Sequence, residues 1–118
     1  MMPELVFYDE SGRAVAYTED GEHIFGYSGV PLAYVEGDSV YSYSGAHLGW
    51  YLDGWIRDHA GACVYFTEAA TGGPIKPMRA VKPVKGVKSI LPIRGIKAIK
   101  PLRPLNQFDW SLVLKFGE

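Results

Sequence analysis

The chain has 118 residues, of which 47% are hydrophobic, 14% aromatic and 21% charged, and its net charge is −1. This composition fits one small globular domain. No apolar run approaches the ~20 residues that cross a bilayer, and a single cysteine, Cys63, excludes an intrachain disulfide. The sequence shows no secretory signal, so we expect a cytoplasmic protein without a membrane span.

The first part of the chain consists of four tandem repeats of about sixteen residues. Position one of the repeat is apolar: Phe7, Ile24, Val40 and Ile56. Position six is glycine: Gly12, Gly29, Gly45 and Gly61. Position nine is aliphatic: Val15, Leu32, Leu48 and Val64. Position eleven is aromatic: Tyr17, Tyr34, Trp50 and Phe66.

Each repeat is predicted to form a β-hairpin. Glycine adopts a positive φ without steric cost, so position six predicts a tight turn between two strands. Positions nine and eleven are two residues apart, and we expect both side chains to face the core from one side of a strand. Second turns are expected near Asp20-Gly21, Gly37-Asp38, Asp53-Gly54 and Ala70-Thr71. One hairpin is marginal alone, which favours four hairpins arranged radially.

Residues 75–104 form ten consecutive triplets. The first member is apolar: Ile75, Met78, Val81, Val84, Val87, Ile90, Ile93, Ile96, Ile99 and Leu102. The second is basic except for Leu91: Lys76, Arg79, Lys82, Lys85, Lys88, Arg94, Lys97, Lys100 and Arg103. The third is small or proline: Pro77, Ala80, Pro83, Gly86, Ser89, Pro92, Gly95, Ala98, Pro101 and Pro104. A period of three with many prolines predicts a polyproline II ribbon with an apolar, a basic and a small edge.

Charge and length both indicate how this ribbon is held. Residues 1–74 contain two basic and eleven acidic residues, a net charge of −9, whereas residues 75–118 carry +8. We expect the two parts to attract each other.

At ~3.1 Å per residue the ribbon is about 93 Å long, and the hairpin domain is about 30 Å across. A straight ribbon therefore cannot lie wholly on its own repeats. We expect it to fold back at Gly86 and Gly95, or to have its apolar edge covered by other chains, and we favour a mixture of docking on the repeats and contact with neighbouring subunits.

After the ribbon, alternating apolar residues predict a closing strand over residues 105–118. The apolar face consists of Phe108, Trp110, Leu112, Leu114 and Phe116. A short helix from Asp109 is the alternative, because Trp110 and Leu114 also have helical spacing. We expect an all-β single domain: hairpins at 7–23, 24–39, 40–55 and 56–71 within residues 1–74, then the ribbon and the closing strand.

No residue pattern indicates a catalytic, metal or cofactor site. The three histidines, His23, His47 and His59, lack metal-ligand spacing, and Cys63 is expected to be a packed thiol. Aspartates beside the turns are expected to cap their own backbone. The aromatic column is expected to be core, with Trp50, Tyr51 and Trp55 as the best candidates for an exposed ligand-stacking cluster.

Three stretches resemble the bacterial four-fold beta-flower proteins. They are IFGYSGVPLAYVEGD, VYSYSGAHLGWYLDGWIRDHAG and PIKPMRAVKPVKG. The resemblance covers nearly the whole chain and implies four petals of β-hairpins, with no assigned activity and no catalytic residue. Tyr65 departs from the pattern, since a glycine is expected before Phe66.

These features favour a non-enzymatic structural or protein-interaction module. It would self-associate through an interaction edge in the ribbon: Val81, Val84, Val87, Ile90, Ile93, Ile96 and Ile99. Its expected partner is a second copy or another protein. The alternative is a nucleic-acid or anionic-surface binder that uses the basic ladder from Lys76 to Arg103. A third hypothesis, an enzyme or small-ligand binder near Trp50 and Trp55, requires a deep cleft.

Overall fold

The computed structural model describes residues 4–111, and within that range it contains eight strands and no helix. The strands are β1 (Leu5–Tyr8), β2 (Ala14–Thr18), β3 (His23–Gly26), β4 (Pro31–Glu36), β5 (Ser39–Tyr41), β6 (His47–Leu52), β7 (Trp55–Arg57) and β8 (Cys63–Phe66). Consecutive strands pair antiparallel, and β1 also pairs with β8, so the sheet closes on itself. No helix that could cross a membrane occurs in this part of the chain.

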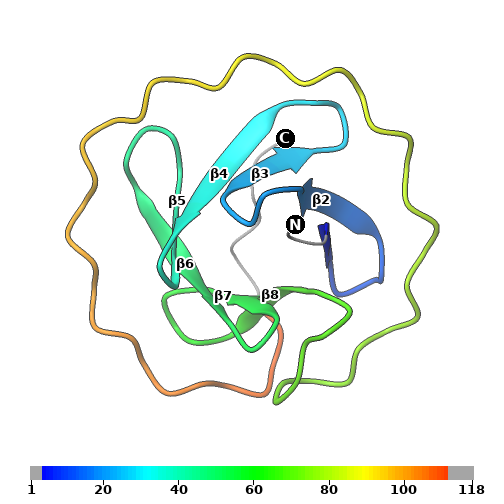
Figure 1. The fold of residues 1–118 in the computed structure, drawn as a ribbon. Helices are drawn as coiled ribbons and strands as arrows, with labels where there is room; N and C mark the ends of the chain where they lie inside the picture. Colours follow the sequence, from blue (N-terminus) through cyan, green and yellow to red (C-terminus); the bar gives the residue numbers. More distant parts are fainter. Residues whose placement is uncertain (1–3, 112–118) are drawn as a thin grey trace.

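Each sequence repeat forms one petal, and the four petals are arranged radially, as predicted (Figure 1). The petals are the hairpins β1–β2, β3–β4, β5–β6 and β7–β8. The glycine of position six lies in the turn within each petal, which we call the outer turn. Gly29 and Gly45 have φ values of 101° and 102°, a conformation that side chains with a Cβ rarely adopt. The prediction of glycine-dependent turns is therefore confirmed.

The expectation that positions nine and eleven share one side of a strand is wrong. In the first petal Phe7 pairs with Ala16 but Tyr8 pairs with Ala14, so the register slips at Val15. The same slip occurs at position nine in the other three petals. A β-bulge adds one residue to a strand and shifts the alternation of its side chains. Val15 consequently packs on the central cluster with Phe7, whereas Tyr17 belongs to a second cluster.

The centre of the flower is filled by the position-one side chains. Phe7, Ile24, Val40 and Ile56 are each at most 1% exposed and belong to one cluster. Position ten is small in three petals: Ala16, Ala33 and Gly49. In the fourth petal it is Tyr65, which joins the same cluster and is buried. The departure of Tyr65 from the repeat pattern thus places one aromatic ring in the centre among small neighbours.

Residues 74–107 contain neither strand nor helix and run once around the petals, forming what we call the ring (Figure 1). The assumption of a straight ribbon is wrong, because the ring curves around the petals, and the alternative of a fold-back at Gly86 and Gly95 does not occur. A contour of about 93 Å closes into a circle about 30 Å across. The molecule measures 36 × 36 × 29 Å. The contour length of the ribbon, which exceeds the width of the hairpin domain, therefore matches the circumference of that domain.

The predicted closing strand is described only as far as residue 111. In that part Trp110 forms a parallel bridge with Cys63 and packs against Trp55 and Phe66. Phe108, which was assigned to the buried face of this strand, is 72% exposed. The remaining residues of that face, Leu112, Leu114 and Phe116, lie outside the described residues.

Candidate functional site

The small edge of the ring faces the outer turns. A Cβ placed on Gly29 would lie 1.9 Å from the Val87 carbonyl oxygen, and one on Gly45 would lie 2.0 Å from that of Ile96. Gly12 and Gly61 meet the carbonyls of Met78 and Leu105 in the same way. The ring therefore touches one petal every nine residues. Glycine is needed in the outer turn for close approach as well as for its positive φ.

Backbone hydrogen bonds fix these contacts. The outer-turn glycine carbonyls accept hydrogen bonds from ring N–H groups nine residues apart, which belong to Ala80, Ser89, Ala98 and Gln107, at 2.8–3.0 Å. Gly86 and Gly95 also donate, to the carbonyls of Tyr27 and Tyr43, at 2.7 Å each. The corresponding ring positions at the other two petals are Pro77 and Pro104, which have no N–H. Docking of the ring on its own repeats, one part of the predicted mixture, is confirmed.

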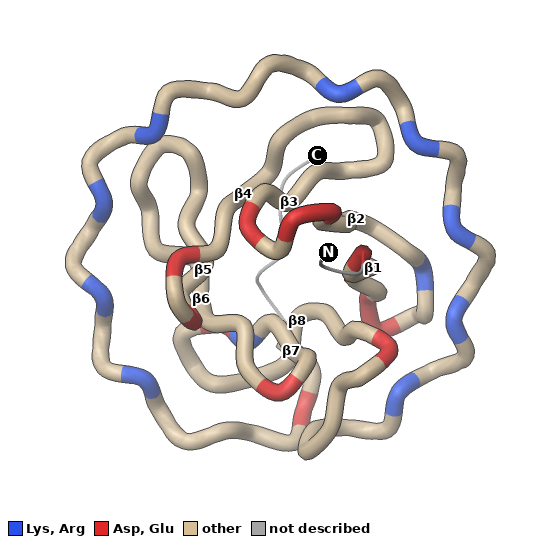
Figure 2. Tube along the Cα trace, viewed as in Figure 1, with Lys and Arg blue, Asp and Glu red and all other residues tan. Residues whose placement is uncertain are grey.

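The basic edge of the ring reaches inward over one face of the flower. Lys85 contacts Glu4 at 2.7 Å and Glu19 at 2.8 Å, and Arg79 contacts Glu68 at 3.2 Å. Three more ion pairs join Lys88 to Glu19, Arg94 to Glu22 and Lys97 to Glu36. Figure 2 shows the acidic residues inside the circle of basic ones. The predicted attraction between the acidic and basic parts of the chain is confirmed.

The same cations cover the aromatic side chains between the petals. The Lys85 ammonium lies 4.5 Å from the centre of the Tyr17 ring, and the Arg94 guanidinium carbon lies 3.9 Å from that of Tyr34. Both tyrosines belong to the position-eleven column and are at most 1% exposed. Cation–π contacts of this kind contribute about 0.5–2 kcal/mol each. The aromatic column is therefore part of the core, as predicted, and cations of the ring cover it.

The ion pairs predict an acid-sensitive ring. Hydrogen bonds from Lys85 and Lys88 lower the pKa of Glu19, and the bond from Lys97 lowers that of Glu36, below the usual value of 4.5. Carboxylates with depressed folded-state pKa values stabilise the fold above the unfolded pKa, and this stability is lost as the pH falls through the folded pKa. We expect the melting temperature to be level above about pH 4.5 and to fall below it.

Calorimetric scans between pH 6 and pH 3 measure this effect, and the double variant Glu19→Gln, Glu36→Gln provides the control. The variant should lose part of the acid-dependent fall in melting temperature. An unchanged slope in the variant would show that these carboxylates do not set the acid sensitivity.

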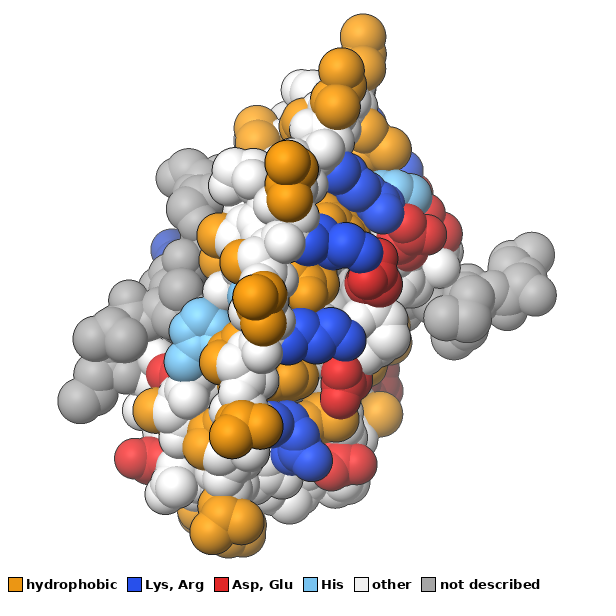
Figure 3. Space-filling view, turned by 90° about the vertical axis from the view of Figure 1, so that its left-hand side faces the viewer, with side chains coloured by type: hydrophobic (Ala, Val, Ile, Leu, Met, Phe, Trp, Pro, Cys, Tyr) orange, Lys and Arg blue, Asp and Glu red, His pale blue; other side chains and the backbone are white. Residues whose placement is uncertain are grey.

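The apolar edge of the ring points away from the protein. Its side chains are between 85% and 97% exposed: Ile75, Met78, Val81, Val84, Val87, Ile90, Ile93, Ile96, Ile99, Leu102 and Leu105. On the side of the molecule drawn in Figure 3, hydrophobic side chains follow the ring in a row, with basic side chains beside them and acidic side chains beyond. We call this row the apolar rim. The petals contact the small and basic edges of the ring and leave the apolar edge exposed.

The two ends of the ring meet at a seam held by Arg57. The Arg57 side chain is buried, and its Nη1 donates to the carbonyls of Gly61 and Gln107 at 2.7 Å each. Its Nη2 donates to the Gly72 carbonyl at 3.1 Å. One guanidinium therefore joins the fourth outer turn to both ends of the ring. Arg57 was not predicted to be a functional residue. The sequence does mark it: position two of the repeat is aromatic in the first three petals, as Tyr8, Phe25 and Tyr41, and is Arg57 in the fourth.

Beside the seam, the gap between the third and fourth petals contains a histidine pair. His47 Nδ1 lies 3.0 Å from His59 Nε2, and His47 Nε2 lies 3.2 Å from Ser39 Oγ. Burial lowers the pKa of His47, which favours the neutral ring. No group of three or more potential metal ligands occurs among residues 4–111.

The other candidates are structural. Cys63 is buried, and burial raises its pKa to about 11, so the thiol is unreactive at neutral pH. Asp9 and Asp58 accept hydrogen bonds from backbone N–H groups of their own turns, which confirms the capping prediction at these two positions. Trp50 and Trp55 are at most 3% exposed and offer no stacking surface.

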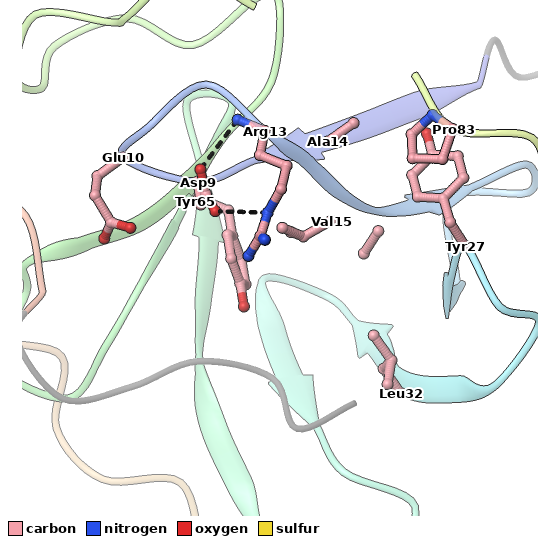
Figure 4. Close-up of a pocket in the computed structure, with 10 residues that line it drawn as sticks. Asp9, Glu10, Arg13, Ala14, Val15, Tyr27, Leu32, Tyr65 and Pro83 are labelled. Carbon is pink, nitrogen blue, oxygen red and sulfur yellow. Dashed lines mark hydrogen bonds and ion pairs between the residues drawn. The ribbon is translucent and has the colours of Figure 1, made fainter. Parts of the chain in front are cut away.

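One cavity, of about 450 Å³, lies between the first two petals and the centre (Figure 4). Arg13 and Tyr65 line one side of it, and Tyr27 and Leu32 line the other. Its cation, Arg13, pairs with Asp9 at 3.4 Å. A second cavity, of about 530 Å³, is lined by Lys82 and residues of β1. Neither cavity includes the Trp50–Trp55 region proposed for a ligand.

Comparison with known proteins agrees with this architecture. A family model described as 4-fold beta flower protein matches residues 6–117, which include all four petals and the ring. No curated protein and no solved structure matches the chain. With four radial hairpins in the structure and a family match over most of its length, the chain belongs to the 4-fold beta flower protein family.

Proposed function

We propose that this protein is a non-enzymatic interaction module that associates with other copies of itself through the apolar rim. The observation that carries this proposal is the exposure of the rim, in which Ile93, Ile96 and Ile99 are each at least 95% exposed. A row of eleven exposed apolar side chains on a small protein is typical of a surface that contacts another molecule. No petal covers it, and in our proposal the cover is another copy of the chain.

A second copy fits this surface better than a nucleic acid does. The ion pairs with glutamates occupy five residues of the basic ladder in the described part: Arg79, Lys85, Lys88, Arg94 and Lys97. This pairing neutralises more than half of the nine cations of the ladder and weakens its attraction for phosphates. The whole chain carries a net charge of only −1, so copies repel each other weakly.

The test of self-association is the molecular mass in solution. Light scattering over a concentration series should show association for the natural chain. Val84→Asp and Ile93→Asp should reduce it at least tenfold, because each places a charge in an interface that excludes water, at about 1.4 kcal/mol or more. Both side chains are exposed in the single chain, so the fold should be retained.

Lys82→Gln is the matched control. It changes the net charge by the same amount as Val84→Asp, on the same part of the ring, but lies outside the apolar rim. We expect its association to equal that of the natural chain. A natural chain that stays monomeric at every concentration would overturn the proposal.

A further inference from the structure

The apolar rim repeats itself around the molecule with the spacing of the petals. The ring meets an outer turn at residues 78, 87, 96 and 105. Between successive contacts lie three arcs, each with two exposed aliphatic side chains: Val81 and Val84, Ile90 and Ile93, and Ile99 and Leu102. In the fourth sector the chain enters and leaves the ring (Figure 1). The molecule therefore presents nearly the same apolar surface three times.

The curvature of the rim limits what one contact can bury. The molecule is 36 Å across in the plane of the ring. Aliphatic side chains follow each other about every 9 Å along a polyproline II contour. When two such convex rims meet edge to edge, only about two or three side chains of each copy come within the ~4.5 Å that defines contact. A stable interface requires roughly 800 Å² and 20–30 residues from each partner, which is far more than one arc provides.

We infer that the rim is multivalent: copies of this chain pack edge to edge through its three arcs, and the assembly grows in a layer instead of closing as a dimer. This inference rests on the proposed function. One contact leaves two arcs bare and provides too little area, so association becomes favourable only when each copy has several neighbours. The first and third arcs lie on opposite sides of the ring, with the second between them.

Arc-specific variants test the valence. Three double variants each place two aspartates in one arc: Val81→Asp with Val84→Asp, Ile90→Asp with Ile93→Asp, and Ile99→Asp with Leu102→Asp. Sedimentation velocity and negative-stain microscopy would give the size and shape of each assembly. We expect every single-arc variant to form smaller assemblies than the natural chain without becoming monomeric. Loss of the second arc should leave linear rows, and loss of all three arcs should give monomers.

The outcomes separate this inference from the proposed function. If the natural chain forms a discrete dimer that does not grow with concentration, or if one single-arc variant alone gives monomers, self-association holds but the multivalent rim is overturned. If the natural chain is monomeric throughout, both are overturned. Circular dichroism of each variant, with Lys82→Gln as control, checks that the fold is retained.

Discussion

Replacing Gly29 with alanine is expected to release the ring from the second petal and to lower the free energy of unfolding by about 3–5 kcal/mol. Two effects add up. The residue has a φ of 101°, which strains any residue with a Cβ. The new Cβ would also lie 1.9 Å from the Val87 carbonyl oxygen, so the ring must move away. That movement breaks the bonds from Ser89 to Gly29 and from Gly86 to Tyr27.

Gly37→Ala is the matched control for this substitution. Gly37 also has a positive φ, of 64°, but a Cβ there meets nothing within 4 Å. It should therefore show backbone strain alone, about 1–2 kcal/mol. Urea denaturation measures both losses, and trypsin should cleave the ring at Lys85 and Lys88 faster only in Gly29→Ala. Equal losses in the two variants would mean that close contact with the ring does not constrain the outer turn.

Arg57→Met is expected to open the seam of the ring and to lower the free energy of unfolding by about 3–5 kcal/mol. Methionine retains much of the side-chain volume but leaves three carbonyls, those of Gly61, Gly72 and Gln107, without the guanidinium donors. Arg57→Lys should restore little of the loss, because an ammonium cannot reproduce the planar fork that spans the two ends of the ring.

The control for Arg57 is Arg13→Met. Arg13 forms an ion pair with Asp9, but its side chain is 75% exposed, so its removal should change stability by less than about 1 kcal/mol. Hydrogen exchange gives the local measurement: the amide of Gln107, which donates to Gly61, should lose protection in Arg57→Met. A variant with natural stability and a protected Gln107 amide would show that the seam is held by other contacts.

The sequence predicted the elements of the fold better than their arrangement. Glycine at position six specified each outer turn through local backbone sterics, and a period of three in residues 75–104 indicated an extended ribbon. The bulge at position nine could not be predicted from alternation, because alternation assumes an uninterrupted strand. It separated Val15 from Tyr17, which the spacing had placed together.

The sequence left open which edge of the ribbon faces the petals. Ten aliphatic residues suggested burial of the apolar edge, yet the small edge faces the petals, because only Gly, Pro, Ala or Ser allows the ring backbone to approach the outer turns. The assumption of a straight ribbon failed. Residues 74–107 form neither strand nor helix, so the hydrogen bonds to each petal determine the path of the ring. Gly86 and Gly95 were the residues in the sequence that indicated which edge of the ribbon faces the petals.

The ring meets the petals in the order in which the chain forms them, at intervals of nine residues. Petal number and ring length are consequently coupled, although they are encoded in separate parts of the chain. A fifth hairpin inserted among the repeats would leave one outer turn without its carbonyl partner unless nine further residues entered the ring. Growth of this architecture by duplication thus requires two matched insertions, one on each side of the boundary between hairpins and ring, and a single insertion would break the closure.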